Sequence, residues 1–338
     1  MNAIRAATVL LMLALHAAAF GAGAEDGVPA MDPATGGGDV DRDFLPPPPG
    51  RLVDLGSHRL HLYCIGAGSP TVVLEAGLGG LSLEWRAVQS ALAAERRVCS
   101  YDRAGYGWSD PGPAPRTVDR IAAELRAMLE QAGESPPYAI VGHSFGGYVA
   151  QLFAKRYPRE VAGVVLVDSS HPDQYRRFPR DYQEKYDRGT RRRSSWGASI
   201  ALPEHYPDPW RPLAESLMQQ PKTLRALRLE YRSFVRSGEQ VAAAGAMPVV
   251  PAVVLTRGER EWPEGADGDA MEALWPELQR DLAAAMPLGH HFVIGGSGHH
   301  IHLERPEAVE QAVRLIVEQG ECRAVLASAP ARPGSRRC

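Results

Sequence analysis

Gly142-His143-Ser144-Phe145-Gly146 spells G-x-S-x-G, and its neighbours give the pattern a mechanical meaning. The apolar, β-prone run 138–141 precedes it, and residues 147–157 after it have the pattern of a helix that ends before a proline. A serine on a tight turn between a strand and a helix is a nucleophile elbow, in which glycines remove Cβ clashes and the hydroxyl stands clear of the sheet. We therefore predict that Ser144 is a catalytic nucleophile, and not an incidental serine in a structural glycine turn.

Composition sets broad limits on the class of protein. The chain has 338 residues, of which 44% are apolar and 23% charged, as in ordinary globular proteins. This length allows one large α/β domain or two ordinary ones. The net charge of −3 shows no strong bias, so the composition indicates neither a nucleic acid nor an anionic membrane surface as a partner.

The N-terminus has the pattern of a signal peptide over residues 1–24. A short positive region is followed by an uncharged stretch, 6–20, and by an A-x-A-like site, Ala22-Gly23-Ala24. This stretch is shorter than the roughly 20 apolar residues that a membrane span needs. We expect a secreted or periplasmic protein with no stable membrane anchor after cleavage. Residues 25–50, rich in Gly, Pro and Asp, are predicted to form a linker.

The four cysteines fit an oxidising compartment. Their spacings match neither a zinc site nor a C-x-x-C redox motif, and an exported protein can hold disulfides. Of the possible pairings we favour Cys64 with Cys99, both on predicted strands, and Cys322 with Cys338. Free buried thiols are the alternative for the first pair.

The remaining pattern predicts an α/β fold with a mostly parallel sheet, helices on both faces and a helical insertion. Residues 169–247 lack buried-strand runs and carry aromatic–proline clusters, so we expect a helical cap over the mouth of the site. The sheet then comes from two core parts, 51–168 and 248–320, followed by a tail over 321–338. The expected strands are 52–55, 59–64, 71–75, 97–101, 138–141, 161–167, 252–255 and 292–294, and the expected core helices are 85–94, 119–132, 147–157 and 306–319.

A serine nucleophile needs a base, and the base needs an orienting acid. His299 follows the last expected strand in a glycine-rich loop, and we predict that it is the base, with His300 as the neighbour that could be mistaken for it. For the acid, Asp168 ends a buried strand directly after the elbow and is favoured because it is rigidly held. Glu261 is the alternative, although its loop is crowded with charge and has the pattern of a solvated surface.

The oxyanion of an acyl-transfer intermediate needs preorganised N–H donors. One is expected to be the backbone N–H of Phe145, directly after the nucleophile at a helix N-terminus. The other is expected from the turn Gly77-Leu78-Gly79, at the N–H of Leu78.

Four segments in this order resemble the α/β-hydrolase superfamily, and the similarity extends from about residue 52 to residue 318. They are 72–77, 101–109, the elbow at 142–146, and 298–306. The resemblance implies an eight-stranded sheet, a cap after the sixth strand and no cofactor. Two departures stand out. Ala76 replaces the histidine that is common before the oxyanion glycine. Glu261 occupies the position where the family most often has the triad aspartate, so the choice between Asp168 and Glu261 as the acid stays undecided.

The identity of the nucleophile narrows the expected reaction. Relatives that open epoxides or displace halide use a carboxylate at the elbow, so Ser144 argues against both. We expect a serine hydrolase, with carboxylesterase activity on small to medium acyl substrates favoured. The alternatives are an aminopeptidase-like or amidase activity, a carbon–carbon bond hydrolase and, least favoured, a non-catalytic binding module. The expected partner is a small-molecule ester or amide, and neither a cofactor nor a metal is expected.

Overall fold

The computed structural model describes residues 46–191 and 202–328. They contain an eight-stranded sheet in the order β1-β2-β4-β3-β5-β6-β7-β8, which confirms the predicted fold class. The strands are β1 (Arg51–Asp54), β2 (Arg59–Ile65), β3 (Thr71–Glu75), β4 (Val98–Tyr101), β5 (Tyr138–His143), β6 (Val161–Val167), β7 (Pro251–Arg257) and β8 (Leu288–Ile294).

The sheet is antiparallel at one edge and parallel elsewhere. β2 pairs antiparallel with β1 and β4, and all pairs from β4 to β8 are parallel. β5 lies between β3 and β6 and is buried along its whole length, as expected for a parallel strand covered on both faces. The carboxyl ends of β5, β6, β7 and β8 therefore meet at one end of the sheet.

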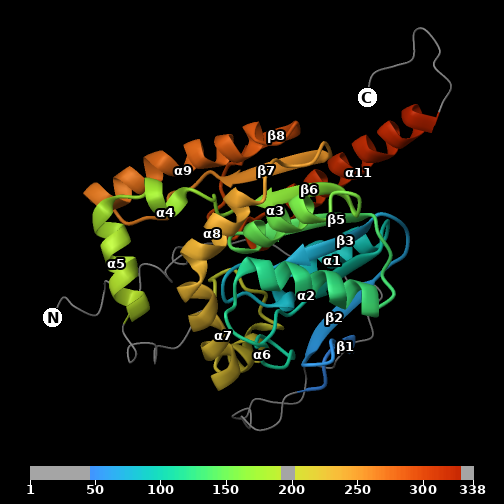
Figure 1. Cartoon of the computed structure of the whole chain (residues 1–338), viewed down its shortest axis with the longest axis horizontal. Coiled ribbons are helices and arrows are strands. Elements are labelled where there is room, and N and C mark those ends of the chain that lie inside the picture. Colours follow the sequence, from blue (N-terminus) through green and yellow to red (C-terminus); the bar gives the residue numbers. More distant parts are fainter. Residues whose placement is uncertain (1–45, 192–201, 329–338) are drawn as a thin grey trace.

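Helices cover both faces of the sheet (Figure 1). On one face α2 (Val118–Gln131) and α3 (Gly146–Arg156) pack side chains such as Leu125 and Phe153 into the larger core cluster. On the other face α1 (Arg86–Ala93) and α11 (Pro306–Ser328) contribute Val88 and Val313 to a second cluster. The short 3₁₀ helix η1 (Ser82–Trp85) precedes α1, and α10 (Ile301–Glu304) precedes α11.

The described residues between β6 and β7, 168–191 and 202–250, form helices and connecting turns, in agreement with their lack of strand patterns. Figure 1 shows three of these helices, α5, α6 and α7, to the left of the sheet. The helices of this segment are α4 (Gln174–Arg177), α5 (Arg180–Arg191), α6 (Arg211–Met218), α7 (Pro221–Arg232) and α8 (Phe234–Ala243).

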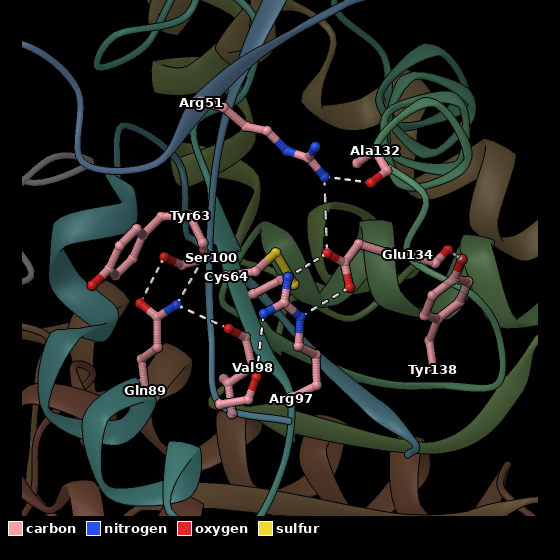
Figure 2. The surroundings of a disulfide bond; sticks show 12 residues. Arg51, Tyr63, Cys64, Gln89, Arg97, Val98, Ser100, Ala132, Glu134 and Tyr138 are labelled. Carbon is pink, nitrogen blue, oxygen red and sulfur yellow. Dashed lines mark hydrogen bonds and ion pairs between the residues drawn. A yellow bond between two sulfur atoms is a disulfide. The ribbon is translucent and has the colours of Figure 1, made fainter. Parts of the chain in front are cut away.

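A disulfide joins β2 to β4. Cys64 and Cys99 are register partners on these antiparallel strands, and their sulfur atoms are 2.08 Å apart, which confirms the first predicted pair. Figure 2 shows Gln89 of α1 beside it, where its side-chain amide donates to the carbonyl oxygens of Tyr63 and Val98. The predicted signal peptide, Cys338 and the side chain of Cys322 lie outside the described residues, so the second predicted pair does too.

One helix was not expected, and another is longer than expected. Helix α9 (Ala266–Ala284) was not predicted, because Pro276 in its interior interrupts the apolar pattern that reveals a helix. The final helix was expected to end at residue 319 but continues to Ser328, so the predicted tail boundary at 321 falls inside it. A single glycine such as Gly320 costs a helix only about 1 kcal/mol and does not end it. Among residues 46–191 and 202–328, no helix combines the length and apolar character that a membrane crossing requires.

Candidate active site

The elbow serine sits on a strained turn at the end of β5. Ser144 has a φ of 51°, in the left-handed region that residues with a Cβ rarely adopt, and its N–H donates to the carbonyl of Val167 at 3.0 Å. A Cβ at Gly142 would lie 2.5 Å from the Gly146 carbonyl oxygen, and one at Gly146 would lie 2.5 Å from the Ala76 oxygen. The glycines of the motif therefore allow the close backbone approaches that form the turn.

Asp168 contacts the imidazole of His299. Its Oδ2 lies 2.6 Å from His299 Nδ1, and the two side chains are 0% and 5% exposed. Two further groups hold the carboxylate, since Trp275 Nε1 donates to Oδ1 at 2.7 Å and the Arg257 guanidinium donates to Oδ2 at 3.1 Å. Like Ser144, Asp168 has a positive φ, at 40°. The structure thus fixes both the position and the orientation of this carboxylate.

The environment of Asp168 keeps it ionised. Burial by itself would raise the pKa of this carboxyl, but the charge of Arg257 and the hydrogen bonds from His299 and Trp275 outweigh it. The net effect is a pKa below the usual range of an aspartate. An ionised Asp168 can accept a hydrogen bond from the N–H at His299 Nδ1, which leaves the other ring nitrogen free to act as a base.

Glu261, the alternative acid, touches a different atom of the same histidine. Its Oε1 accepts the backbone N–H of His299 at 2.5 Å, whereas Asp168 contacts the ring. Burial raises the pKa of this carboxyl, although His299 opposes the shift. The charge-crowded loop is less solvated than expected, because Arg257 is buried against Asp168 and Glu272.

Both expected oxyanion donors lie on the wall of one cavity with Ser144 and His299. Within the described ranges, no backbone acceptor pairs with the N–H of Phe145 or of Leu78. The turn that carries Leu78 is held from behind by Arg103, whose Nη1 donates to the Ala76 oxygen at 2.6 Å and whose Nη2 donates to the Gly77 oxygen at 2.7 Å. With their carbonyls engaged by Arg103, the peptides of this turn have a fixed orientation.

The cavity has a volume of about 170 Å³ and lies between the carboxyl end of the sheet and residues of 170–186 and 202–234. The sheet side is polar, with Ser144, His299, His300, His143 and Glu84. The opposite walls are largely aromatic, with Tyr175, Phe178, Tyr182, Tyr186, Tyr231, Phe234, Trp262 and Trp275. Such a site suits an apolar group that is held next to a polar reacting centre.

Comparison with known proteins shows the family to which this chain belongs. A family model described as the alpha/beta hydrolase fold matches residues 70–240, half of the chain. The chain belongs to the α/β-hydrolase family. YqjL, an uncharacterized protein of Bacillus subtilis, is 27% identical over 248 residues, covering 73% of this chain and 83% of that protein.

Other relatives match over shorter stretches or by fold alone. YbdG of Bacillus subtilis, also uncharacterized, is 31% identical to this α/β hydrolase, but the match spans only 37% of the chain and 39% of that protein. The solved structure of a thermophilic esterase from Thermogutta terrifontis has a TM-score of 0.59 at 24% identity, covering 78% of this chain and 94% of that one. At this identity the likeness concerns the fold.

Histidines crowd around the elbow of this α/β hydrolase. The ring centroids of His299 and His302 lie 4.6 Å and 4.3 Å from that of His143. His143 Nε2 donates to the backbone oxygen of His299 at 3.0 Å, which fixes the loop that carries the expected base. Burial, together with the neighbouring histidines, lowers the pKa of His143 well below its usual range.

Sequence reasoning missed four residues that hold the site of this α/β hydrolase. Trp275 was missed with helix α9, and Arg257 was assigned to a solvated loop although it directly follows a buried apolar run. Arg103 and Glu230 form a buried ion pair at 2.9 Å between the loop after β4 and α7. Arg103 lies in the 101–109 segment that carried the resemblance, and that was the available signal for it. No comparable signal marks Glu230, because only the folded chain brings it to Arg103.

Proposed function

We propose that this α/β hydrolase is a serine hydrolase, and that its preferred substrates are small to medium carboxylic esters with an apolar or aromatic group. One observation carries the proposal. Asp168 Oδ2 lies 2.6 Å from His299 Nδ1, and His299 lines the same cavity as Ser144, the serine of the strained elbow. Ser144, Asp168 and His299 follow one another in the chain order of an α/β-hydrolase triad, and in this proposal they are its nucleophile, acid and base.

The proposed reaction proceeds through an acyl-enzyme. Ser144 attacks the acyl carbonyl while His299 Nε2 takes the hydroxyl proton, and the ionised Asp168 stabilises the imidazolium that forms. The N–H groups of Phe145 and Leu78 bind the oxyanion of the tetrahedral intermediate, each worth about 3–4 kcal/mol in the transition state. His299 then returns the proton to the leaving alcohol, and water releases the acid by the same steps.

The cavity supports the substrate class. Its aromatic walls come mostly from α4, α5, α7 and α8, which act in this proposal as the predicted cap. A volume of about 170 Å³ fits a short acyl chain or a single aromatic ring. Because apolar burial is worth about 25 cal/mol per Å², such a group would supply much of the binding free energy.

The test is covalent labelling followed by a substrate panel. A fluorophosphonate probe should label the wild type at Ser144 and should fail to label Ser144→Ala. Ser170→Ala is the matched control, since Ser170 also lines the cavity, and it should be labelled normally. Equal labelling of Ser144→Ala and wild type, or no labelling of either, would sink the proposal.

A panel of chromogenic esters and aminoacyl anilides then separates the activities. We expect kcat/KM for aryl and short-chain esters to exceed that for anilides of similar size by at least about tenfold. A preference for anilides would instead assign the protein to the amidase or aminopeptidase class.

A further inference from the structure

Three buried side chains converge beside the elbow without a role in the proposed triad. Glu84 comes from η1, His143 from the end of β5 and His302 from α10, and they are 5%, 2% and 0% exposed. One donor atom from each lies within 4.8 Å of the other two. The three donors come from elements far apart in the sequence, so no spacing motif marked them.

Among the described residues, three of the four ring nitrogens of His143 and His302 have no hydrogen-bond partner. Because His143 Nε2 donates to a carbonyl oxygen, that nitrogen carries the proton, and the lone pair is on Nδ1. Within the described part of the chain, neither His143 Nδ1 nor either ring nitrogen of His302 has a hydrogen-bond partner. Buried polar atoms are almost always satisfied, so unpartnered lone pairs that face one another point to a missing ligand.

The spacing of the donors suits a metal ion better than a hydrogen bond. His302 Nε2 lies 3.6 Å from Glu84 Oε2, too far for a direct hydrogen bond. Two ligands of one tetrahedral zinc ion, each at about 2.0–2.2 Å, are separated by roughly 3.4 Å. Trp85 packs against His302 with the ring planes tilted by 32° and the centroids 4.4 Å apart, which holds that imidazole in place.

Glycines keep the space beside these donors open. A Cβ at Gly77 would lie 2.8 Å from His143 Nδ1, and a Cβ at Gly80 would lie 2.6 Å from Glu84 Oε2. Glu84 and His143 also line the active-site cavity, so a fourth ligand position would face that cavity.

We propose that Glu84, His143 and His302 form a binding site for one divalent transition-metal ion, with Zn²⁺ as the cation that this donor set suits best. Two imidazoles and one carboxylate match zinc, whereas calcium and magnesium prefer all-oxygen sites. The ion would join η1, the end of β5 and α10 directly behind the nucleophile turn. Its role is to position the elbow, and no step of the proposed reaction passes through it.

Zinc uptake tests the site without any measurement of activity. Tag-free full-length protein is dialysed against EDTA and then titrated with Zn²⁺ in competition with a chromophoric chelator. We expect one Zn²⁺ per chain with a Kd of micromolar or tighter, and a rise in Tm with Zn²⁺ concentration, because a ligand that binds only the folded state stabilises it. An absence of stoichiometric uptake together with an unchanged Tm would overturn the proposal.

Variants locate the bound ion. Glu84→Gln and His302→Asn should each weaken Zn²⁺ binding at least tenfold, whereas His290→Gln on β8 should not, since His290 lies outside the group. His299→Ala should also bind normally, because the His299 ring only packs against His143, with centroids 4.6 Å apart, and is not one of the three proposed ligands. Loss of uptake in His299→Ala would place the zinc on the proposed base and overturn the assignment. If a ligand variant fails to fold, the Zn²⁺-dependent Tm of the wild type and of His299→Ala still decides.

Discussion

At the level of single residues, His299 is held from two sides by two carboxylates with different tasks. Asp168 reaches the ring nitrogen, whereas Glu261 reaches the backbone N–H. A carboxylate on the ring sets the tautomer and stabilises the imidazolium, while one on the backbone positions only the loop. The contacts therefore favour Asp168 as the acid of the proposed triad and give Glu261 a positioning role.

Asp168→Asn and Glu261→Gln should separate these roles. Asp168→Asn removes the negative charge and the preference for the correct tautomer, so kcat should fall by about 10³–10⁴. Glu261→Gln keeps an acceptor for the backbone N–H, so kcat should fall by less than about tenfold. Ester hydrolysis by the purified variants measures both. The reverse order of effects would make Glu261 the acid.

Gly298 tests the packing of the histidine loop. A Cβ at this position would overlap Glu261 Oε1 and lie 3.2 Å from Glu304 Oε1. These two carboxylates accept the N–H groups of His299 and Gly298, so Gly298→Ala must displace side chains that hold the loop. We expect a loss of about 1–3 kcal/mol in the free energy of unfolding and a lower kcat. Gly295→Ala is the control on the same loop, because nothing lies within 4 Å of its Cβ. Urea unfolding of the two variants should differ, and equal stabilities would contradict the packing argument.

At the level of elements, a buried charge network ties the oxyanion turn to the helical segment above the cavity. Arg103 bridges Glu75 at the end of β3, at 2.7 Å, and Glu230 on α7, at 2.9 Å. All three are buried, and the same guanidinium holds two carbonyls of the oxyanion turn. A displacement of α7 would therefore be transmitted to the oxyanion turn through the side chain of Arg103.

The network predicts a pH-dependent stability. Burial raises the pKa of Glu75 from 4.5 to about 7, although Arg103 and Tyr101 oppose the shift. Between these values the folded chain holds a proton that the unfolded chain has released, so the free energy of unfolding should fall as the pH rises. The fall is up to about 3 kcal/mol and levels off above about pH 7.

Glu75→Gln should remove most of this slope, because the amide has no proton to lose. Urea unfolding at several pH values measures the slope, and Glu239→Gln, an exposed position on α8, should retain it. The same slope in both variants would mean that another group titrates.

At the level of the whole molecule, the disulfide links β2, at the antiparallel edge, to β4 and so to the rest of the sheet. The Cys64–Cys99 bond closes a sequence separation of 35 residues, for which loop entropy gives roughly 3–4 kcal/mol of stabilisation. The Cys64→Ala/Cys99→Ala variant should lose about that much in the free energy of unfolding. The free energy of unfolding of wild-type protein treated with a reductant should approach that of the variant. Equal stability of the oxidised wild type, the reduced wild type and the variant would show that the bond contributes nothing.

We propose that the chain is exported, because a disulfide forms and persists in oxidising compartments and the N-terminus has the pattern of a signal peptide. Expression with the native N-terminus in a Gram-negative host should place the protein in the periplasm. N-terminal sequencing should then find a mature chain that begins at Glu25. Retention in the cytosol at full length would contradict this proposal.

The sequence by itself determined whatever depends on local pattern. Continuous apolar runs predicted the parallel strands, and β3 and β6 have the bounds that were expected. The G-x-S-x-G pattern between an apolar run and a helical pattern identified the elbow, and the close approach of Gly142 to the Gly146 oxygen lies within the motif itself. The disulfide between Cys64 and Cys99 followed from their places on two expected strands.

Only the tertiary structure decided how distant residues meet. Asp168 and Glu261 both followed buried strands, and the fold brought one to the ring of His299 and the other to its backbone. Trp275, Arg103 and Glu230, and the group of Glu84, His143 and His302, likewise acquire their contacts from different elements. Such contacts depend on how strands and helices pack, which periodicity along the chain does not encode.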